Sequence, residues 1–184
     1  MLFSNQAKNK AKKMVTALAL AALPMLGWAE DITGIWRTVD DRTGFSKALV
    51  HIYRDKNGTY TGQIVKIIPR PNYIPKEFCQ RCPEPWTNQR ILGMKPLWGM
   101  QDTSTGNLYA GGRILDPLSG NIYNSKAKLS ADGRRLSMRG YIGLSLLGRT
   151  QVWIRESNKE LLDAIPPEMK AQIAAHDNIA PSKP

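Results

Sequence analysis

Residues 139–155 read Arg139-Gly-Tyr-Ile-Gly-Leu-Ser-Leu-Leu-Gly-Arg-Thr-Gln-Val-Trp-Ile-Arg155, and this stretch decides the fold. It predicts two strands that are joined by an apolar loop with glycines at its edges. A matching strand lies near the start of the domain, at Thr33-Gly-Ile-Trp36. Because the first and last strands of a closed antiparallel barrel pair with each other, we expect these two stretches to lie side by side.

The hairpin just upstream supports this interpretation. With Asp132-Gly133 as its two-residue turn, Leu129 faces Leu136 on one side of the sheet and Lys126 faces Arg139 on the other. This register separates apolar from polar side chains along both strands, and a shift of one residue would destroy the separation. Two like charges opposite each other are mildly unfavourable. An anionic ligand, Asp116 or Glu156 could neutralise the pair, but we expect the two side chains to splay apart into solvent.

Turn residues divide the earlier part of the chain into further strands, at 32–38, 45–53, 59–68, 91–101 and 108–115. A proline-rich loop at 69–90 interrupts them, because proline cannot take part in regular strand pairing. About eight strands in one meander predict an all-β fold, a single antiparallel up-and-down β-barrel.

The two ends of the chain lie outside this barrel. Residues 1–29 combine lysines, an apolar run from Met14 to Leu26 and small residues before Glu30, which predicts a cleavable signal peptide. Residues 30–156 form the barrel domain. Residues 157–184 form a short helical and disordered tail, whose first helix begins at the capping box Ser157-Asn-Lys-Glu160 and ends at Pro166-Pro167.

Charge and cysteine content are interpreted for the exported protein that the signal peptide predicts. The net charge of the whole chain is +11, but four of its 26 basic residues leave with the signal peptide. All 15 acidic residues remain, so the mature charge is about +7. We expect a periplasmic or secreted monomer that binds no nucleic acid and weakly prefers anionic lipid or polysaccharide. Cys79 and Cys82 have neither the context of a thioredoxin-like motif nor a second zinc-binding pair, so we expect a local disulfide.

Gly34-Ile-Trp36 on the first strand, with Arg149 or Arg155 on the last, resembles the lipocalin and calycin arrangement. That resemblance implies a tryptophan that plugs one barrel end and an arginine that packs across it. Residues 34–44, 114–120 and 139–155 together resemble the bacterial exported family known as domain of unknown function 2147. The likeness covers about residues 32–156, the cysteine pair fits it too, and it implies no activity.

The candidate ligand-binding residues lie at the two ends of the domain: Trp36, Arg139, Tyr141, Leu144, Leu146, Leu147, Arg149, Trp153 and Arg155. Alternation puts Arg149, Trp153 and Arg155 on one strand face, where arginines could hold an anionic group. The simpler interpretation, which we favour, is an arginine stacked on Trp36 or Trp153 as a structural plug.

The apolar loop at 143–148 carries Leu144, Leu146 and Leu147 between flanking arginines. That combination suits a molecule with an apolar body and an anionic end, such as a fatty acid, or an anionic membrane surface. The leucines could equally fold inward and cap the core.

These patterns leave three classes of function open. We expect a non-enzymatic barrel that binds a small lipophilic or anionic ligand or the envelope surface, without cofactor or metal. A barrel filled by Trp36, Trp98, Met138 and Trp153 would instead be a structural or interaction module. No catalytic motif is recognisable, and in an enzyme we would look at His51, Tyr141 and the aspartates of the barrel mouth.

Overall fold

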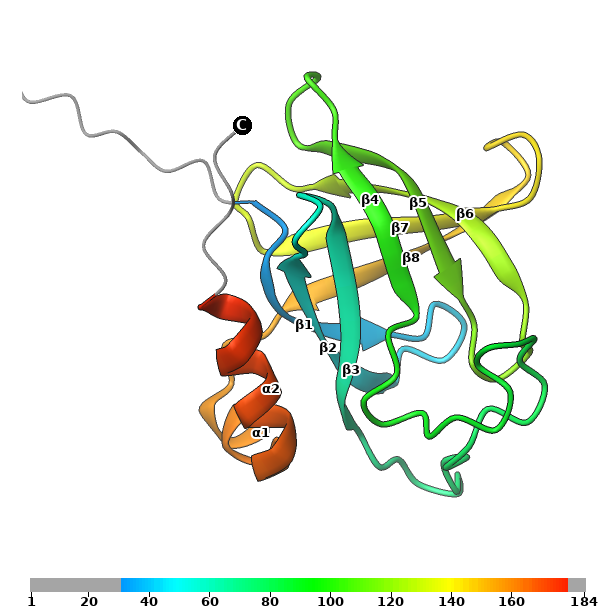
Figure 1. Ribbon diagram of the computed structural model, residues 1–184, viewed down its shortest axis with the longest axis vertical. Helices are drawn as coiled ribbons and strands as arrows, with labels where there is room; N and C mark the ends of the chain where they lie inside the picture. The colour runs from blue at the N-terminus through cyan, green and yellow to red at the C-terminus, as the bar shows by residue number, and fades with distance from the viewer. Residues whose placement is uncertain (1–30, 179–184) are drawn as a thin grey trace, which may run out of the picture.

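The computed structural model describes residues 31–178, which form a closed antiparallel barrel with two short helices on its outside (Figure 1). The eight strands follow one another around the barrel in chain order, so the predicted all-β, up-and-down architecture is confirmed. Their bounds are β1 Gly34–Val39, β2 Ser46–Arg54, β3 Tyr60–Ile67, β4 Leu97–Asp102, β5 Leu108–Leu115, β6 Ile122–Leu129, β7 Arg135–Tyr141 and β8 Gly148–Arg155. The predicted signal peptide lies outside the described residues.

The barrel closes where the sequence predicts, between its first and last strands. Trp36 of β1 lies opposite Arg155 of β8, and Thr38 lies opposite Trp153. The hairpin of β6 and β7 has the predicted register, with Leu129 opposite Leu136. The fourth strand differs from its prediction, because β4 starts only at Leu97 and the preceding residues continue the long loop.

One end of the barrel is filled by side chains. Trp36, Tyr60, Met100 and Leu136 are completely buried there, and the indole of Trp36 donates a hydrogen bond to the carbonyl of Ile32 at 2.8 Å. The other end is surrounded by the β1–β2, β3–β4, β5–β6 and β7–β8 connections, and we call it the mouth. The long β3–β4 loop lies below the barrel in Figure 1.

The helices that follow β8 are α1, Lys159–Asp163, and α2, Pro167–Asp177. The N-cap of α1 is Asn158 rather than the predicted Ser157, because the Asn158 side chain accepts the hydrogen bond from the Leu161 amide. The first helix ends before Pro166-Pro167, as predicted, and Pro167 begins the second helix, since proline lacks only an amide hydrogen that the first helical turn leaves unbonded.

The second helix packs against the outer faces of β2 and β3 (Figure 1). Met169 joins Leu49 and Val65 in a second apolar cluster, outside the barrel. None of the helices in the described part of the chain is long and apolar enough to cross a membrane.

Candidate functional site

A cavity of about 710 Å³ occupies the mouth half of the barrel. Its inner wall is apolar because the inward positions of the strands carry aliphatic and aromatic side chains at this level. The wall includes Ala48, Val50, Ile64, Ile114, Met138 and Trp153. Gly140 of β7 also lines the cavity, and its missing side chain leaves room beside Tyr123 and Ile114. The barrel is therefore filled at one end and hollow at the other.

The rim of this cavity is predominantly basic. Six basic side chains line it, against the carboxylates of Asp40 and Asp116: Arg42, Lys47, Arg70, Lys76, Arg81 and Arg149. Among the described residues, Arg42, Lys76 and Arg81 take part in no ion pair, and all three are exposed. An anionic group at the mouth would therefore meet uncompensated positive charge.

Two aspartates of the β1–β2 turn hold part of this rim in place. Asp41 accepts two hydrogen bonds from Arg149, one of them from Nε at 2.6 Å. These bonds are the main reason why the pKa of Asp41 is lowered. Burial alone would raise the pKa of Asp40, but the backbone amides of Arg42 and Thr43, with nearby Lys47, lower it to about 2. Both carboxylates are thus ionised at neutral pH, and Arg149 is neutralised by Asp41.

Thr38 and Trp153 bring polar groups into the largely apolar wall, which Gln151 also lines. Thr38 has its hydroxyl hydrogen-bonded to the backbone of Ala48 on the neighbouring strand. Trp153 is only 4% exposed, and its indole N–H has no hydrogen-bond partner among the described residues. A buried donor without an acceptor is unfavourable, and such groups occur where a ligand or water completes the hydrogen bonding.

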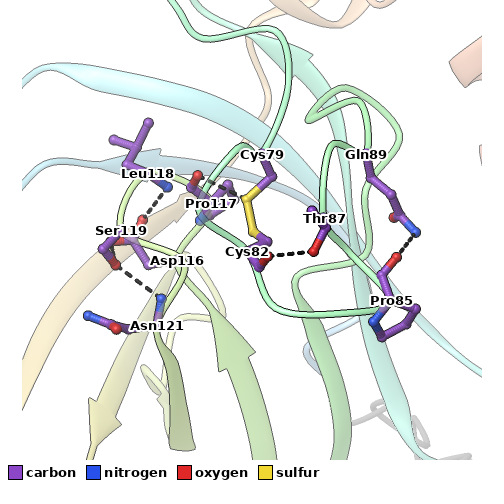
Figure 2. The surroundings of a disulfide bond; sticks show 10 residues. All are labelled: Cys79, Cys82, Pro85, Thr87, Gln89, Asp116, Pro117, Leu118, Ser119 and Asn121. Carbon is purple, nitrogen blue, oxygen red and sulfur yellow. Dashed lines mark hydrogen bonds between the residues drawn. A yellow bond between two sulfur atoms is a disulfide. The ribbon is translucent and has the colours of Figure 1, made fainter.

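The long β3–β4 loop is pinned beside the mouth. Cys79 and Cys82 form a disulfide, as predicted, and the Cys79 sulfur lies 3.1 Å from the carbonyl oxygen of Pro117 in the β5–β6 turn (Figure 2). The contact is so close that a Cβ atom on Gly120 would lie 1.9 Å from the carbonyl oxygen of Arg81. This loop brings Arg70, Lys76 and Arg81 to the rim of the cavity.

The predicted site residues separate into different parts of the molecule. Arg155 stacks on Trp36 at the filled end, so the plug interpretation is confirmed and Arg155 is the arginine that makes it. Arg149 lies at the opposite end, with Tyr141 and Leu147 on the rim, and Trp153 lines the cavity. Leu144 and Leu146 lie in the same loop as Leu147 but do not line the cavity.

The expectation that the side chains of Lys126 and Arg139 point apart into solvent is wrong, because both bind the β7–β8 loop. Arg139 lies outside the barrel, where its Nε donates to the carbonyl of Ser145 at 2.7 Å and its Nη2 to that of Leu146 at 2.9 Å. Lys126 donates to the hydroxyl of Ser145. Two backbone carbonyls of the β7–β8 loop and the hydroxyl of Thr150, and neither Asp116 nor Glu156, therefore accept the hydrogen bonds of the arginine.

The inward-facing interpretation of the apolar loop is also wrong. Leu144, Leu146 and Leu147 are 72%, 86% and 79% exposed. Trp98 does not fill the barrel either, because it stacks on Trp86 of the long loop with ring centres 5.1 Å apart. Glycine with positive φ at residue 99 lets β4 bulge, so Leu97 and Met100 point inward while Trp98 does not.

His51, one of the residues considered for catalysis, lies far from the mouth. It is fully buried under α2, and its Nε2 lies 2.8 Å from Oδ1 of Asp177. His176 of the same helix stacks on Tyr53, with ring centres 3.8 Å apart. These contacts hold the helix on the barrel, and the structure does not bring His51 together with Tyr141 or the mouth aspartates.

Sequence reasoning missed most of the cavity. The basic residues of the long loop could not be assigned to the cavity, because a proline-rich segment lacks the strand or helix periodicity that shows which way a side chain points. Gly140 and Gln151 were detectable in principle, because strand alternation places them on the inward face with Met138 and Trp153.

Comparison with known proteins agrees with this geometry. The sequence profile of the family described as "Uncharacterized protein conserved in bacteria (DUF2147)" matches residues 34–155. The chain is similar in fold to a solved structure described as "Protein HP1028 from the human pathogen Helicobacter pylori belongs to the lipocalin family", with a TM-score of 0.60 and 18% sequence identity. The similarity covers 78% of this chain and 97% of that one. A search of curated proteins gave no match.

Proposed function

This chain belongs to the bacterial DUF2147 family, and from its lipocalin-like barrel we propose that it binds a small amphiphilic anion, such as a fatty acid or lipid fragment. The apolar part of the ligand lies in the mouth half of the barrel, between Val50, Met138 and Trp153. Its anionic end lies at the rim, near Lys76 and Arg81. The protein acts as a carrier or sensor of that molecule and carries out no reaction on it.

The observation that carries this proposal is the combination of an apolar wall and a basic rim in one cavity. Its volume of about 710 Å³ is within the range of small-molecule sites in proteins. A fully apolar ligand would leave the rim cations without a partner, whereas a small polar ion would leave the apolar wall unused. The indole N–H of Trp153, which has no hydrogen-bond partner within residues 31–178, adds a donor within the wall.

We further propose that the protein acts as a monomer in the periplasm or outside the cell. The predicted signal peptide and the Cys79–Cys82 disulfide support this location, because disulfides persist in oxidising compartments. An exported carrier would handle lipophilic molecules of the cell envelope.

The test is displacement of the fluorescent fatty acid cis-parinaric acid, with a variant that fills the cavity. Gly140 has an ordinary backbone conformation, and a Cβ atom there would make only normal contacts at 3.4 Å or more. Gly140→Leu should therefore fill part of the cavity without disturbing β7, and it should abolish probe binding. Ser137→Leu adds the same side chain to the outer face of the same strand and should bind like the wild type.

The head-group preference is tested by competition. A fatty acid should displace the probe better than the fatty alcohol of the same chain length, and Lys76→Gln with Arg81→Gln should remove that difference. If the wild type binds no probe, or if Gly140→Leu binds as well as the wild type, the cavity is not the ligand site.

A further inference from the structure

The exposed apolar side chains of this protein gather at the mouth. Within residues 31–178, the exposed large apolar side chains all lie in loops of the mouth end, except Leu108 and Val152. The mouth group comprises Phe45, Ile74, Phe78, Leu118, Ile142, Leu144, Leu146 and Leu147. A water-soluble surface has no reason to concentrate such residues at one end, and a concentrated apolar surface marks an interaction site.

The β7–β8 connection at residues 142–147, which we call the leucine loop, dominates this group. Its four aliphatic side chains are between 66% and 86% exposed. The loop projects from the end of the barrel and is drawn in yellow in Figure 1.

The leucine loop is held in this exposed conformation by hydrogen bonds. Arg139 donates to the carbonyls of Ser145 and Leu146 and, through Nη1, to the hydroxyl of Thr150 at 2.8 Å. The amide of Leu147 donates to the carbonyl of Leu144 at 3.1 Å, which closes a turn at the tip. The leucines are therefore presented to the outside by a fixed backbone.

Basic residues accompany the apolar ones at the mouth. Arg42 lies in the β1–β2 connection near Phe45, and Lys76 and Arg81 flank Phe78 in the long loop. All three are exposed and form no ion pair among the described residues. Apolar side chains beside cations match a bilayer surface, where the apolar groups enter the boundary of the acyl chains and the cations meet anionic head groups.

We propose that the mouth of the barrel docks on an anionic lipid bilayer, with the leucine loop inserted among the lipids. Leu118, Ile142, Leu147 and the three cations also line the cavity, whereas the other five apolar side chains of the docking surface do not. Docking needs no molecule inside the cavity, so this inference goes beyond the proposed ligand binding and does not depend on it. If both hold, docking places the open end of the cavity against the membrane, where an amphiphilic anion could enter or leave without crossing water.

The experiment is sedimentation with vesicles of phosphatidylcholine, with and without phosphatidylglycerol, using exported protein whose intact mass shows that residues 1–29 are absent. The wild type should sediment with the anionic vesicles, and added salt should weaken binding. The triple variant Leu144→Ser, Leu146→Ser, Leu147→Ser should bind these vesicles at least about tenfold more weakly than the wild type. The double variant Leu108→Ser, Val152→Ser removes exposed apolar side chains away from the mouth and should bind like the wild type.

Two further measurements separate the alternatives. Gly140→Leu should still bind vesicles, which distinguishes docking from occupation of the cavity. Melting curves should be alike for the wild type and the triple variant, because the replaced side chains are exposed. Absence of wild-type binding to anionic vesicles would overturn the proposal, as would equal binding by the triple variant. A dimer in sedimentation velocity that the triple variant loses would assign the leucine loop to self-association instead.

Discussion

The guanidinium carbon of Arg155 lies 4.4 Å from the centre of the Trp36 ring, at the filled end of the barrel. The same guanidinium donates hydrogen bonds to the carbonyls of Gly133, Thr33 and Asp31 at 2.8, 2.6 and 2.6 Å. Arg155 therefore ties the last strand to the segment before β1 and to the β6–β7 turn, while it covers the tryptophan.

This arrangement predicts that the plug stabilises the whole barrel. Trp36→Ala should lower the free energy of unfolding by about 3–5 kcal/mol, because it removes a large and fully buried aromatic side chain. Arg155→Ala should also destabilise, and Arg155→Lys should not restore stability, since lysine lacks the planar fork that reaches several carbonyls. Arg149→Ala is the matched control, because its ion pair with Asp41 is solvent-exposed and worth about 1 kcal/mol or less. Urea unfolding of the four variants checks this, and wild-type stability of Trp36→Ala would contradict it.

The closure of the barrel could be predicted because it depends on local patterns. Alternation along β7 and β8 assigns each residue to a face, and the turn residues Asp132-Gly133 indicate the register of the β6–β7 hairpin. The register is as predicted, although the turn itself is wider than the expected two residues, because Ser130 pairs with Arg135 and the Gly133 amide donates to the Ser130 carbonyl. The sequence did not decide between Arg149 and Arg155 as the plug, because both lie on the inward face of one strand. The two differ in distance along the barrel axis, and that distance depends on the stagger of β8 against β1.

The disulfide predicts a second measurable property. Titration of the exported, denatured and unreduced protein should find no free thiol, because Cys79 and Cys82 are joined. The double variant Cys79→Ser, Cys82→Ser should lose about 2 kcal/mol or less of stability, since the bond closes a very short loop. Two reactive thiols would contradict the prediction, and so would a loss as large as that of the plug variants.

The glycine of the β5–β6 turn is expected to control the position of the disulfide loop. In Gly120→Ala the new methyl group would collide with the Arg81 carbonyl, so the loop has to move away from the turn. Limited proteolysis should then cleave residues 68–96 faster than in the wild type.

Gly111→Ala provides the matched control for that substitution. Both glycines have positive φ, 79° and 76°, so both variants carry the same backbone strain, but nothing lies within 4 Å of a Cβ atom at Gly111. Gly111→Ala should destabilise moderately without exposing the loop. Equal cleavage of the two variants would show that strain, and not the contact with Arg81, controls the loop.

The sequence of α2 offers only Met169 and Ile173, on one side of the helix, to indicate its packing, and both lie in the outer apolar cluster. The sequence of β2 gives a further indication. Leu49 and His51, on the outward face of β2, and Val50 and Ile52, on the inward face, are all buried. Strands that are buried on both faces read as continuous apolar runs, so this run indicated that a further layer covers β2. His51 interrupts this apolar run and was therefore considered as a catalytic residue. Its partner, Asp177, lies 126 positions further along the chain, so the sequence does not reveal the contact.

The histidines under α2 predict how stability depends on pH. Burial lowers the pKa of His51, and Asp177 opposes this shift without cancelling it. Burial, together with the charges of Lys95 and His51, also lowers the pKa of His176. Because the folded-state pKa of each is below the unfolded value of about 6.5, the unfolded chain binds protons more readily than the folded one. Stability should therefore be complete above about pH 6.5 and decrease as the pH falls through the lower, folded-state values.

The helix should respond before the barrel does. Asp177, His176 and Tyr53 face His51, so protonation of the two rings would place like charges beside each other under α2. Acidification from pH 7.5 to 5 should increase hydrogen exchange in residues 167–177 while β6 and β7 stay protected. His51→Gln removes the more buried titrating group and should weaken the pH dependence, whereas His176→Gln should do so less, because His176 is less buried. Equal exchange in α2 at both pH values would contradict the assignment, and so would an unchanged pH dependence in His51→Gln.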